Sequence, residues 1–374
     1  MGACLPAGRA LVAFTAAVLL AGCASSATSQ PSAAPAATAT SSVAAATPMV
    51  AATPTSTPMA TPTGSRGTQP SPTHEAVAST LSVVFSDSTP TESWTPPTMD
   101  VFAPAGGHAL PLVIVFPAHS LTSTDFPVYH QLAEAIAAKG AVVAVANWSQ
   151  TAGGTESPAA AASFMASGRS VAACAVTYAV EHAAGYGADP SRLVLVGQYY
   201  GANVASLEAL APSKPLPGCR AGTTKWAATG VVGWDGDWLA WYEAFDAFGT
   251  DAAKVVAAVS PWSLASSASK VPMTFVSGDF ADMRRCETAA VPWLTWRDPN
   301  GAMRARLKSV GALADGCVDG VGTAKAMAAE FGAHGFRTSL VHLTDVGSMQ
   351  SLLAPADLSR MVDAVVTLTL PVTS

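Results

Sequence analysis

One short stretch near the middle of the chain constrains the fold more than any other. The apolar run 193–196 has the composition of a buried strand, and residues 202–211 have that of a helix. Between them lies the motif Gly197-Gln198-Tyr199-Tyr200-Gly201, in which two glycines flank the point where the chain must change direction. Because glycine tolerates tight turns, this order predicts a strand, a sharp turn and a helix, with Tyr199 at the tip of the turn.

The pattern around this turn alternates between strand-like and helix-like runs from about residue 75. Continuous Val, Leu and Ile strands separated by helices indicate a mainly parallel sheet that is covered on both faces. An irregular insertion with Cys286 and Cys317 interrupts the alternation. We expect strands at 81–85, 99–103, 111–116, 141–146, 192–196, 227–232, 271–277 and 336–343. We expect helices at 129–139, 170–184, 202–211, 323–331 and 356–368, with two short ones around 238–248 and 251–259.

Composition and charge exclude several classes of function. The chain of 374 residues is 50% hydrophobic and 12% charged, with a net charge of −6. No run of Lys and Arg appears, which argues against a nucleic-acid partner. No apolar run of 18 residues occurs in the body of the chain, so no internal membrane span is expected. There is no C-x-x-C pair and the cysteines are widely spaced, so we expect no metal site. No cofactor is expected either.

The N-terminus has the pattern of an export signal. Residues 1–22 hold a basic residue, a short apolar run and the sequence Leu20-Ala21-Gly22 before Cys23. This ending resembles the bacterial lipobox, in which the cysteine is lipidated, and it predicts a protein anchored to the outer face of the cell membrane. The alternative is an ordinary signal peptide with a chance cysteine. Residues 23–74 are rich in Ala, Ser, Thr and Pro, so we expect a disordered tether before a domain at 75–374.

Four cysteines belong to the expected exported domain. An even number in an oxidising compartment favours two disulfides, and four cysteines allow three pairings. We favour the pairs that are nearest in sequence, which are Cys174–Cys219 and Cys286–Cys317.

Several segments around the central turn resemble the α/β-hydrolase superfamily, and its carboxylesterase and lipase-like members in particular. The resemblance covers roughly residues 75–374. It implies an α/β-hydrolase fold with a mostly parallel, doubly covered sheet, a small helical cap and an irregular insertion. The segments that carry it are 111–148 with His119-Ser120, 174–178, 186–192, the turn itself, Ser260-Pro261, Val271-Pro272 and Gly278-Asp279.

The resemblance assigns the catalytic positions but not the usual residues. Members carry a serine nucleophile at the turn, an acid and then a histidine in the loop after the last strand. Here Tyr199 stands at the nucleophile position and Ser348 at the histidine position, and none of the seven histidines falls in that loop. The acid position is open between Asp279, Asp282 and Asp235. The triad is therefore expected to be degenerate.

Two further sets of residues are candidates for a ligand site at the same edge of the sheet. Backbone N–H groups of Tyr200 and of Ser120 or Leu121 are the expected oxyanion-hole donors, because backbone donors survive side-chain changes. His119 and three tryptophans that follow strand ends are candidates for the wall of a cleft; packing against cap helices is the competing interpretation for the tryptophans. These tryptophans are Trp148, Trp234 and Trp262.

The sequence therefore supports two functional hypotheses. The first is a surface-tethered pseudo-hydrolase that has lost acyl transfer and binds a small apolar or ester-like ligand or a partner. The second is an active carboxylic ester hydrolase with a non-standard constellation, such as Tyr199 with a carboxylate. A purely structural envelope protein is a third possibility. Loss of both nucleophile and base favours the first, because removing either alone costs orders of magnitude in rate.

Overall fold

A computed structural model of the chain describes residues 76–88, 97–118, 127–148, 158–236, 238, 260–278, 285–286, 300–343 and 353–369. All of them belong to a compact unit that spans residues 70–374. The expected signal peptide and tether lie outside the described residues. Within the described ranges, no helix is both long and apolar enough to cross a membrane.

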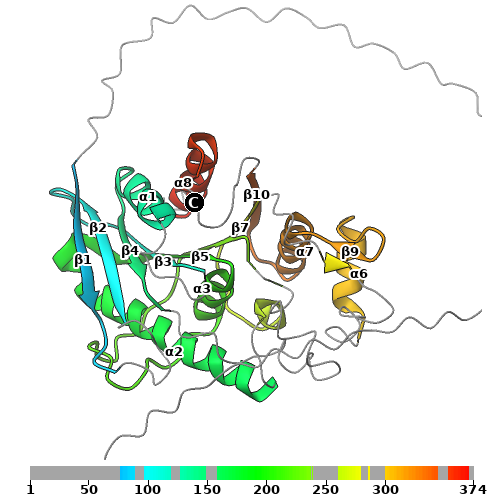
Figure 1. Cartoon of the computed structure of the whole chain (residues 1–374), viewed down its shortest axis with the longest axis horizontal. Coiled ribbons are helices and arrows are strands. Elements are labelled where there is room, and N and C mark those ends of the chain that lie inside the picture. The colour runs from blue at the N-terminus through cyan, green and yellow to red at the C-terminus, as the bar shows by residue number, and fades with distance from the viewer. Residues whose placement is uncertain are drawn as a thin grey trace, which may run out of the picture. The chain divides into compact units, whose positions relative to one another are not determined.

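The centre of the fold is an eight-stranded sheet (Figure 1). Strand β2 runs antiparallel to its neighbours β1 and β4, and every pair from β4 to β10 is parallel. In spatial order the strands are β1 (Val77–Val84), β2 (Thr98–Pro104), β4 (Val142–Ala146), β3 (Leu110–Phe116), β5 (Ala188–Gln198), β6 (Gly230–Trp234), β7 (Met273–Gly278) and β10 (Thr338–Leu343).

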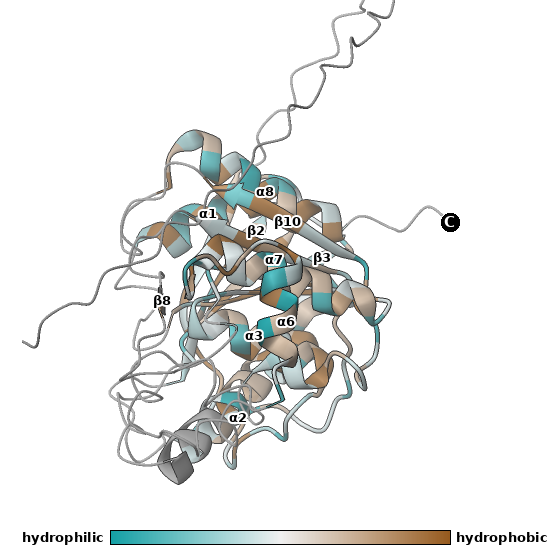
Figure 2. Ribbon diagram, turned by 90° about the vertical axis from the view of Figure 1, so that its right-hand side faces the viewer, coloured by the Kyte–Doolittle hydropathy of each residue, from teal (hydrophilic) through white to brown (hydrophobic). Residues whose placement is uncertain are grey.

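Helices cover both faces of this sheet, as the alternation in the sequence predicts. Helices α1 (Pro127–Ala137) and α8 (Pro355–Thr369) share a hydrophobic core with one face. Helices α2 (Pro158–His182), α3 (Tyr200–Leu210) and α7 (Gly320–Ala333) share a second core with the other. Strand residues alternate between these cores, which is why the strands are continuously apolar. Figure 2 shows helices with both hydrophilic and hydrophobic residues, the pattern of helices that cover a sheet.

The insertion is more regular than the sequence suggests. It contains the helix α6 (Ala302–Ser309) and a two-residue ladder between β8 (Arg285–Cys286) and β9 (Cys317–Val318). Helix α6 was not predicted, because its sequence has only two buried residues and little apolar periodicity. The expected helices around 238–248 and 251–259, which would form the cap, lie outside the described residues except for Trp238.

Both expected disulfides are confirmed. Cys174 of α2 is bonded to Cys219, with 5.6 Å between the Cα atoms. Cys286 is bonded to Cys317 and joins β8 to β9. The first bond ties a fully buried helix position to the loop after α3, whereas Cys286 of the second is exposed.

Candidate functional site

The turn between β5 and α3 has the strained backbone that a nucleophile turn requires. Tyr199 has φ 54° and ψ −116°, a conformation that is costly for a bulky side chain. The turn is held by its main chain: the N–H of Tyr199 donates to the carbonyl of Trp234 at 2.9 Å, and the carbonyl of Tyr199 accepts from the N–H of Ala202 at 3.1 Å. Tyr199 therefore projects from the carboxyl end of β5.

The two glycines of the motif are required by contacts across this turn. A Cβ at Gly197 would lie 2.0 Å from the carbonyl oxygen of Gly201. A Cβ at Gly201 would lie 2.2 Å from the carbonyl oxygen of Phe116 and 2.5 Å from that of Pro117, at the end of β3. Only glycine allows the strand, the helix and the neighbouring strand to approach so closely. The turn is thus intact although its central residue is a tyrosine.

The side chain of Tyr199 is half-buried and lies beside Tyr200. Their ring centroids are 4.3 Å apart and the planes are tilted by 49°. The Tyr199 ring also packs against the core that α2 and α3 share with the sheet. A bulky, half-buried aromatic side chain therefore stands at the tip of the turn. A serine at this position would have a smaller and more exposed side chain.

Asp235 is the candidate acid that the structure describes, and it lies at the same edge of the sheet. It follows Trp234, which pairs with Gln198 across β5 and β6, so Asp235 and Tyr199 follow paired strand residues. Asp235 has φ 43° and is buried, and its Oδ1 accepts a hydrogen bond of 2.7 Å from the N–H of Gly278 at the end of β7. The carboxyl ends of the neighbouring strands β5, β6 and β7 are thereby linked.

The environment of Asp235 favours its neutral form. Burial raises the pKa of Asp235 from 3.8 to about 7, against the opposing effects of the Gly278 N–H, Ser277, Trp234 and His342. Its Oδ2 has no hydrogen-bond partner among the described residues. A carboxyl group with such a pKa exchanges its proton near neutral pH, a property that is common in functional sites.

A buried polar network behind the turn was not predicted. The hydroxyl of Tyr129 accepts the N–H of Ala118 at 2.9 Å and donates to Oε1 of Gln198 at 2.6 Å. Burial raises the pKa of Tyr129 above its ordinary value, so the hydroxyl keeps its proton. The network fixes the start of the loop after β3 against the turn that carries Tyr199. The only hint in the sequence is the polar residue Gln198 at the end of an otherwise apolar strand.

Trp148 and Trp234 are packing residues in the described structure, in line with the interpretation that competes with an open cleft. Trp148 is fully buried and its indole N–H donates to the carbonyl of Pro117 at 2.8 Å. Trp234 is also buried, and only Trp262 is partly exposed. Strand-end position alone could not reveal this, because a large ring at a strand end can also turn back into the core.

Other candidate positions lie outside the described residues and stay predictions. They are His119, Ser120, Leu121, Asp279, Asp282 and Ser348. In the part of the chain that is described, no group of three His, Cys, Asp or Glu side chains could hold a metal ion.

The strand order, the turn after β5 and the two helix layers define an α/β-hydrolase fold, and comparison with solved structures agrees. Esterase B from Lactobacillus rhamnosis, inhibited by a tributyrin phosphonate, superposes with a TM-score of 0.50 at 12% identity, covering 78% of this chain and 85% of that one. A thermostable esterase from Pseudomonas putida has a TM-score of 0.48 at 16% identity, over 79% and 83% of the two chains. No family model and no curated protein matches the sequence. At these identities the likeness concerns the fold alone.

Proposed function

We propose that this domain is a pseudo-hydrolase, which binds a small apolar or ester-like ligand, or a partner, without serine acyl transfer. The observation that carries the proposal is Tyr199 at the tip of an otherwise intact turn. A serine there attacks a carbonyl after a histidine removes its proton. A phenol is a larger and differently directed group, and the expected histidine position holds Ser348.

The retained geometry supports binding rather than loss of function. Gly197 and Gly201 still permit the close approach of β3, β5 and α3. The Tyr129 network still holds Ala118, just after β3, against the turn. A strained tyrosine persists only where the surrounding structure enforces it, and strained residues cluster at functional sites. The Tyr199 ring would then form one wall of a ligand site at the carboxyl edge of the sheet.

An active ester hydrolase is the second candidate, and Asp235 is the observation that favours it. Its pKa of about 7 would allow it to accept or donate a proton at neutral pH. One solved structure with a similar fold is an esterase. In this alternative, Tyr199 with a carboxylate would replace the usual constellation.

Incubation with ethyl butyrate, followed by NMR, distinguishes the two candidates. We expect saturation transfer from the protein to the intact ester and no butyrate above the buffer rate. We also expect no labelling by a fluorophosphonate probe. Replacing Tyr199 by Trp should weaken ester binding several-fold, whereas the matched Tyr200→Phe change should not. Butyrate release by the wild type that is lost in Tyr199→Phe would instead establish the hydrolase.

Anchoring at Cys23 is a further part of the proposal. The lipobox-like ending Leu20-Ala21-Gly22 motivates it. After expression in a bacterial host, mass spectrometry should find a diacylglyceryl group on an N-terminal Cys23, and the protein should partition with membranes. The Cys23→Ala variant should leave the membrane fraction. A mature chain that begins elsewhere without lipid would refute this.

A further inference from the structure

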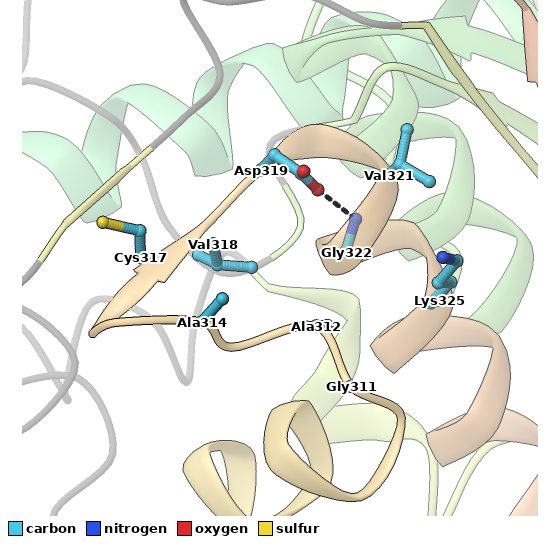
Figure 3. A pocket seen from close by; sticks show the side chains of 9 residues that line it. All are labelled: Gly311, Ala312, Ala314, Cys317, Val318, Asp319, Val321, Gly322 and Lys325. Atoms are coloured by element: carbon cyan, nitrogen blue, oxygen red, sulfur yellow. Dashed lines mark hydrogen bonds between the residues drawn. The ribbon is translucent and has the colours of Figure 1, made fainter.

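Described residues line cavities in two places away from the Tyr199 turn. The first, of about 280 Å³, lies in the insertion between α6 and α7 (Figure 3). Its polar group at the N-terminus of α7 is already engaged, because Oδ1 of Asp319 accepts the N–H of Gly322 at 2.6 Å. The carboxylate of Asp319 also makes this helix end unfavourable for an anion. Nothing in this cavity therefore indicates a ligand.

The second cavity, of about 380 Å³, lies at the opposite edge of the sheet from Tyr199. Its walls come from β1, the end of β2, the turn 105–108 and the short helix η1 (Ala183–Tyr186). The turn precedes β3 and η1 precedes β5, so the cavity lies at the amino ends of these strands. Tyr199 lies beyond the carboxyl end of β5, and the 11 residues of that strand correspond to about 35 Å.

The walls of this cavity are fixed by backbone contacts. Gly187 has φ 76°, and a Cβ there would lie 2.2 Å from the carbonyl oxygen of Gly107. The carbonyl of Gly187 accepts the N–H of Leu110 at 3.0 Å. Glycine is therefore required where the two turns meet, and the cavity between them is preformed, as small-molecule sites usually are.

The lining combines an aromatic ring with a few polar side chains. None of the lining residues is Lys, Arg, Asp or Glu. Tyr186 is half-buried, while Thr80 and His108 are exposed. The side chains of these three residues make no hydrogen bond to another described residue and can bond a ligand. Burial and the nearby Tyr178 raise the pKa of Tyr186, so its hydroxyl stays protonated.

We propose that this cavity is a second binding site, which accepts a neutral, hydroxyl-bearing ring compound such as one or two units of a saccharide. The apolar face of such a ring packs on Tyr186, and its hydroxyls exchange hydrogen bonds with Thr80 and His108. An ionic ligand would find no Lys, Arg, Asp or Glu side chain among the lining residues to pair with. This site is independent of the proposed function, because none of its lining residues lies at the carboxyl edge of the sheet near Tyr199.

Gly185 allows a clean test of this site. A Cβ at Gly185 meets no atom within 4 Å, and its backbone is not in the left-handed region. The Gly185→Leu change should therefore fill the cavity without straining the chain. Ala184→Leu, at an exposed lining position of the same helix, is the second blocking variant. Ala333→Leu, at an exposed position of α7, is the matched control.

Titration with cellobiose and chitobiose, followed by saturation-transfer NMR on the full domain, should detect binding to the wild type. We expect Gly185→Leu and Tyr186→Ala to weaken the affinity at least tenfold, and Tyr186→Phe to weaken it less because the ring remains. Ala333→Leu and Tyr199→Ala should not change the affinity.

No saturation transfer to either disaccharide at millimolar concentration would overturn the proposal. So would binding that survives both blocking variants, or binding that only Tyr199→Ala removes. Stronger binding of inorganic phosphate than of either sugar would also overturn it.

Discussion

Replacement of Asp235 by asparagine is expected to stabilise the domain at pH 8 by up to about 4 kcal/mol. The pKa of Asp235 rises from 3.8 to about 7 on folding because the carboxyl group is buried. Ionising it in the folded state therefore costs free energy, at about 1.4 kcal/mol for each pKa unit. Asparagine keeps an oxygen that can accept the N–H of Gly278 and has no charge to bury.

The sign of the pH dependence follows from the same values. Between pH 3.8 and about 7 the folded protein holds a proton on Asp235 that the unfolded chain has released. The stability that this group contributes is therefore fully present below pH 3.8, is lost as the pH rises through about 7, and is constant above that. Asp235→Asn should remove this component from the curve.

Urea unfolding of both proteins from pH 4 to pH 8 measures the difference. The matched control is Asp319→Asn, at an exposed N-cap where asparagine is an equally good cap, and it should change the curve by only a few tenths of a kcal/mol. Equal stabilities of wild type and Asp235→Asn at pH 8 would contradict the assigned burial cost. If Asp235 takes part in proton transfer, the more stable variant should also be inactive towards esters, because an asparagine amide cannot accept or donate that proton near neutral pH.

Removal of the Cys174–Cys219 disulfide is expected to have an effect of similar size and opposite sign. The bond closes a loop of 45 residues, and the lost constraint on the unfolded chain corresponds to about 4 kcal/mol. The bond also holds the loop after α3 near the end of β1, where the N–H of Arg220 donates to the carbonyl of Phe85 at 2.9 Å. The Cys174→Ala, Cys219→Ala double variant should unfold at a markedly lower urea concentration.

The second disulfide offers an internal comparison. Its loop of 31 residues predicts a similar entropic loss, but Cys286 is exposed whereas Cys174 is fully buried. Only the Cys174 variant leaves a cavity in the core, which adds its own cost. The Cys286→Ala, Cys317→Ala variant should therefore be the less destabilised of the two. The reverse order in parallel urea titrations would show that the insertion contributes more to stability than its exposure indicates.

Local patterns in the sequence were sufficient for most of the fold. The apolar runs at 111–116, 141–146 and 192–196 became the central strands β3, β4 and β5 because continuous hydrophobic strands need cover on both faces. Both disulfide pairs were predicted correctly from the proximity of their cysteines in the sequence. The expected strand at 227–232 became β6 two to three residues later, at Gly230–Trp234. Helix α6 was missed because a short, largely exposed helix leaves almost no periodic signal.

For the candidate site, the sequence predicted less than it did for the fold. The motif Gly197 to Gly201 was sufficient to place Tyr199 on a turn between strand and helix, because spacing between glycines is a local property of the chain. Three facts about the same site depend on contacts between residues far apart in the sequence. These are the burial of Asp235 against Gly278, the Tyr129 bridge from Ala118 to Gln198, and the packing of Trp148 and Trp234 in the core. Such facts depend on which strand ends become neighbours and how far each is covered, and no local pattern encodes that. The residue at the tip of the turn was thus determined by the sequence alone, whereas the protonation of the nearby carboxyl group was decided only by the tertiary structure.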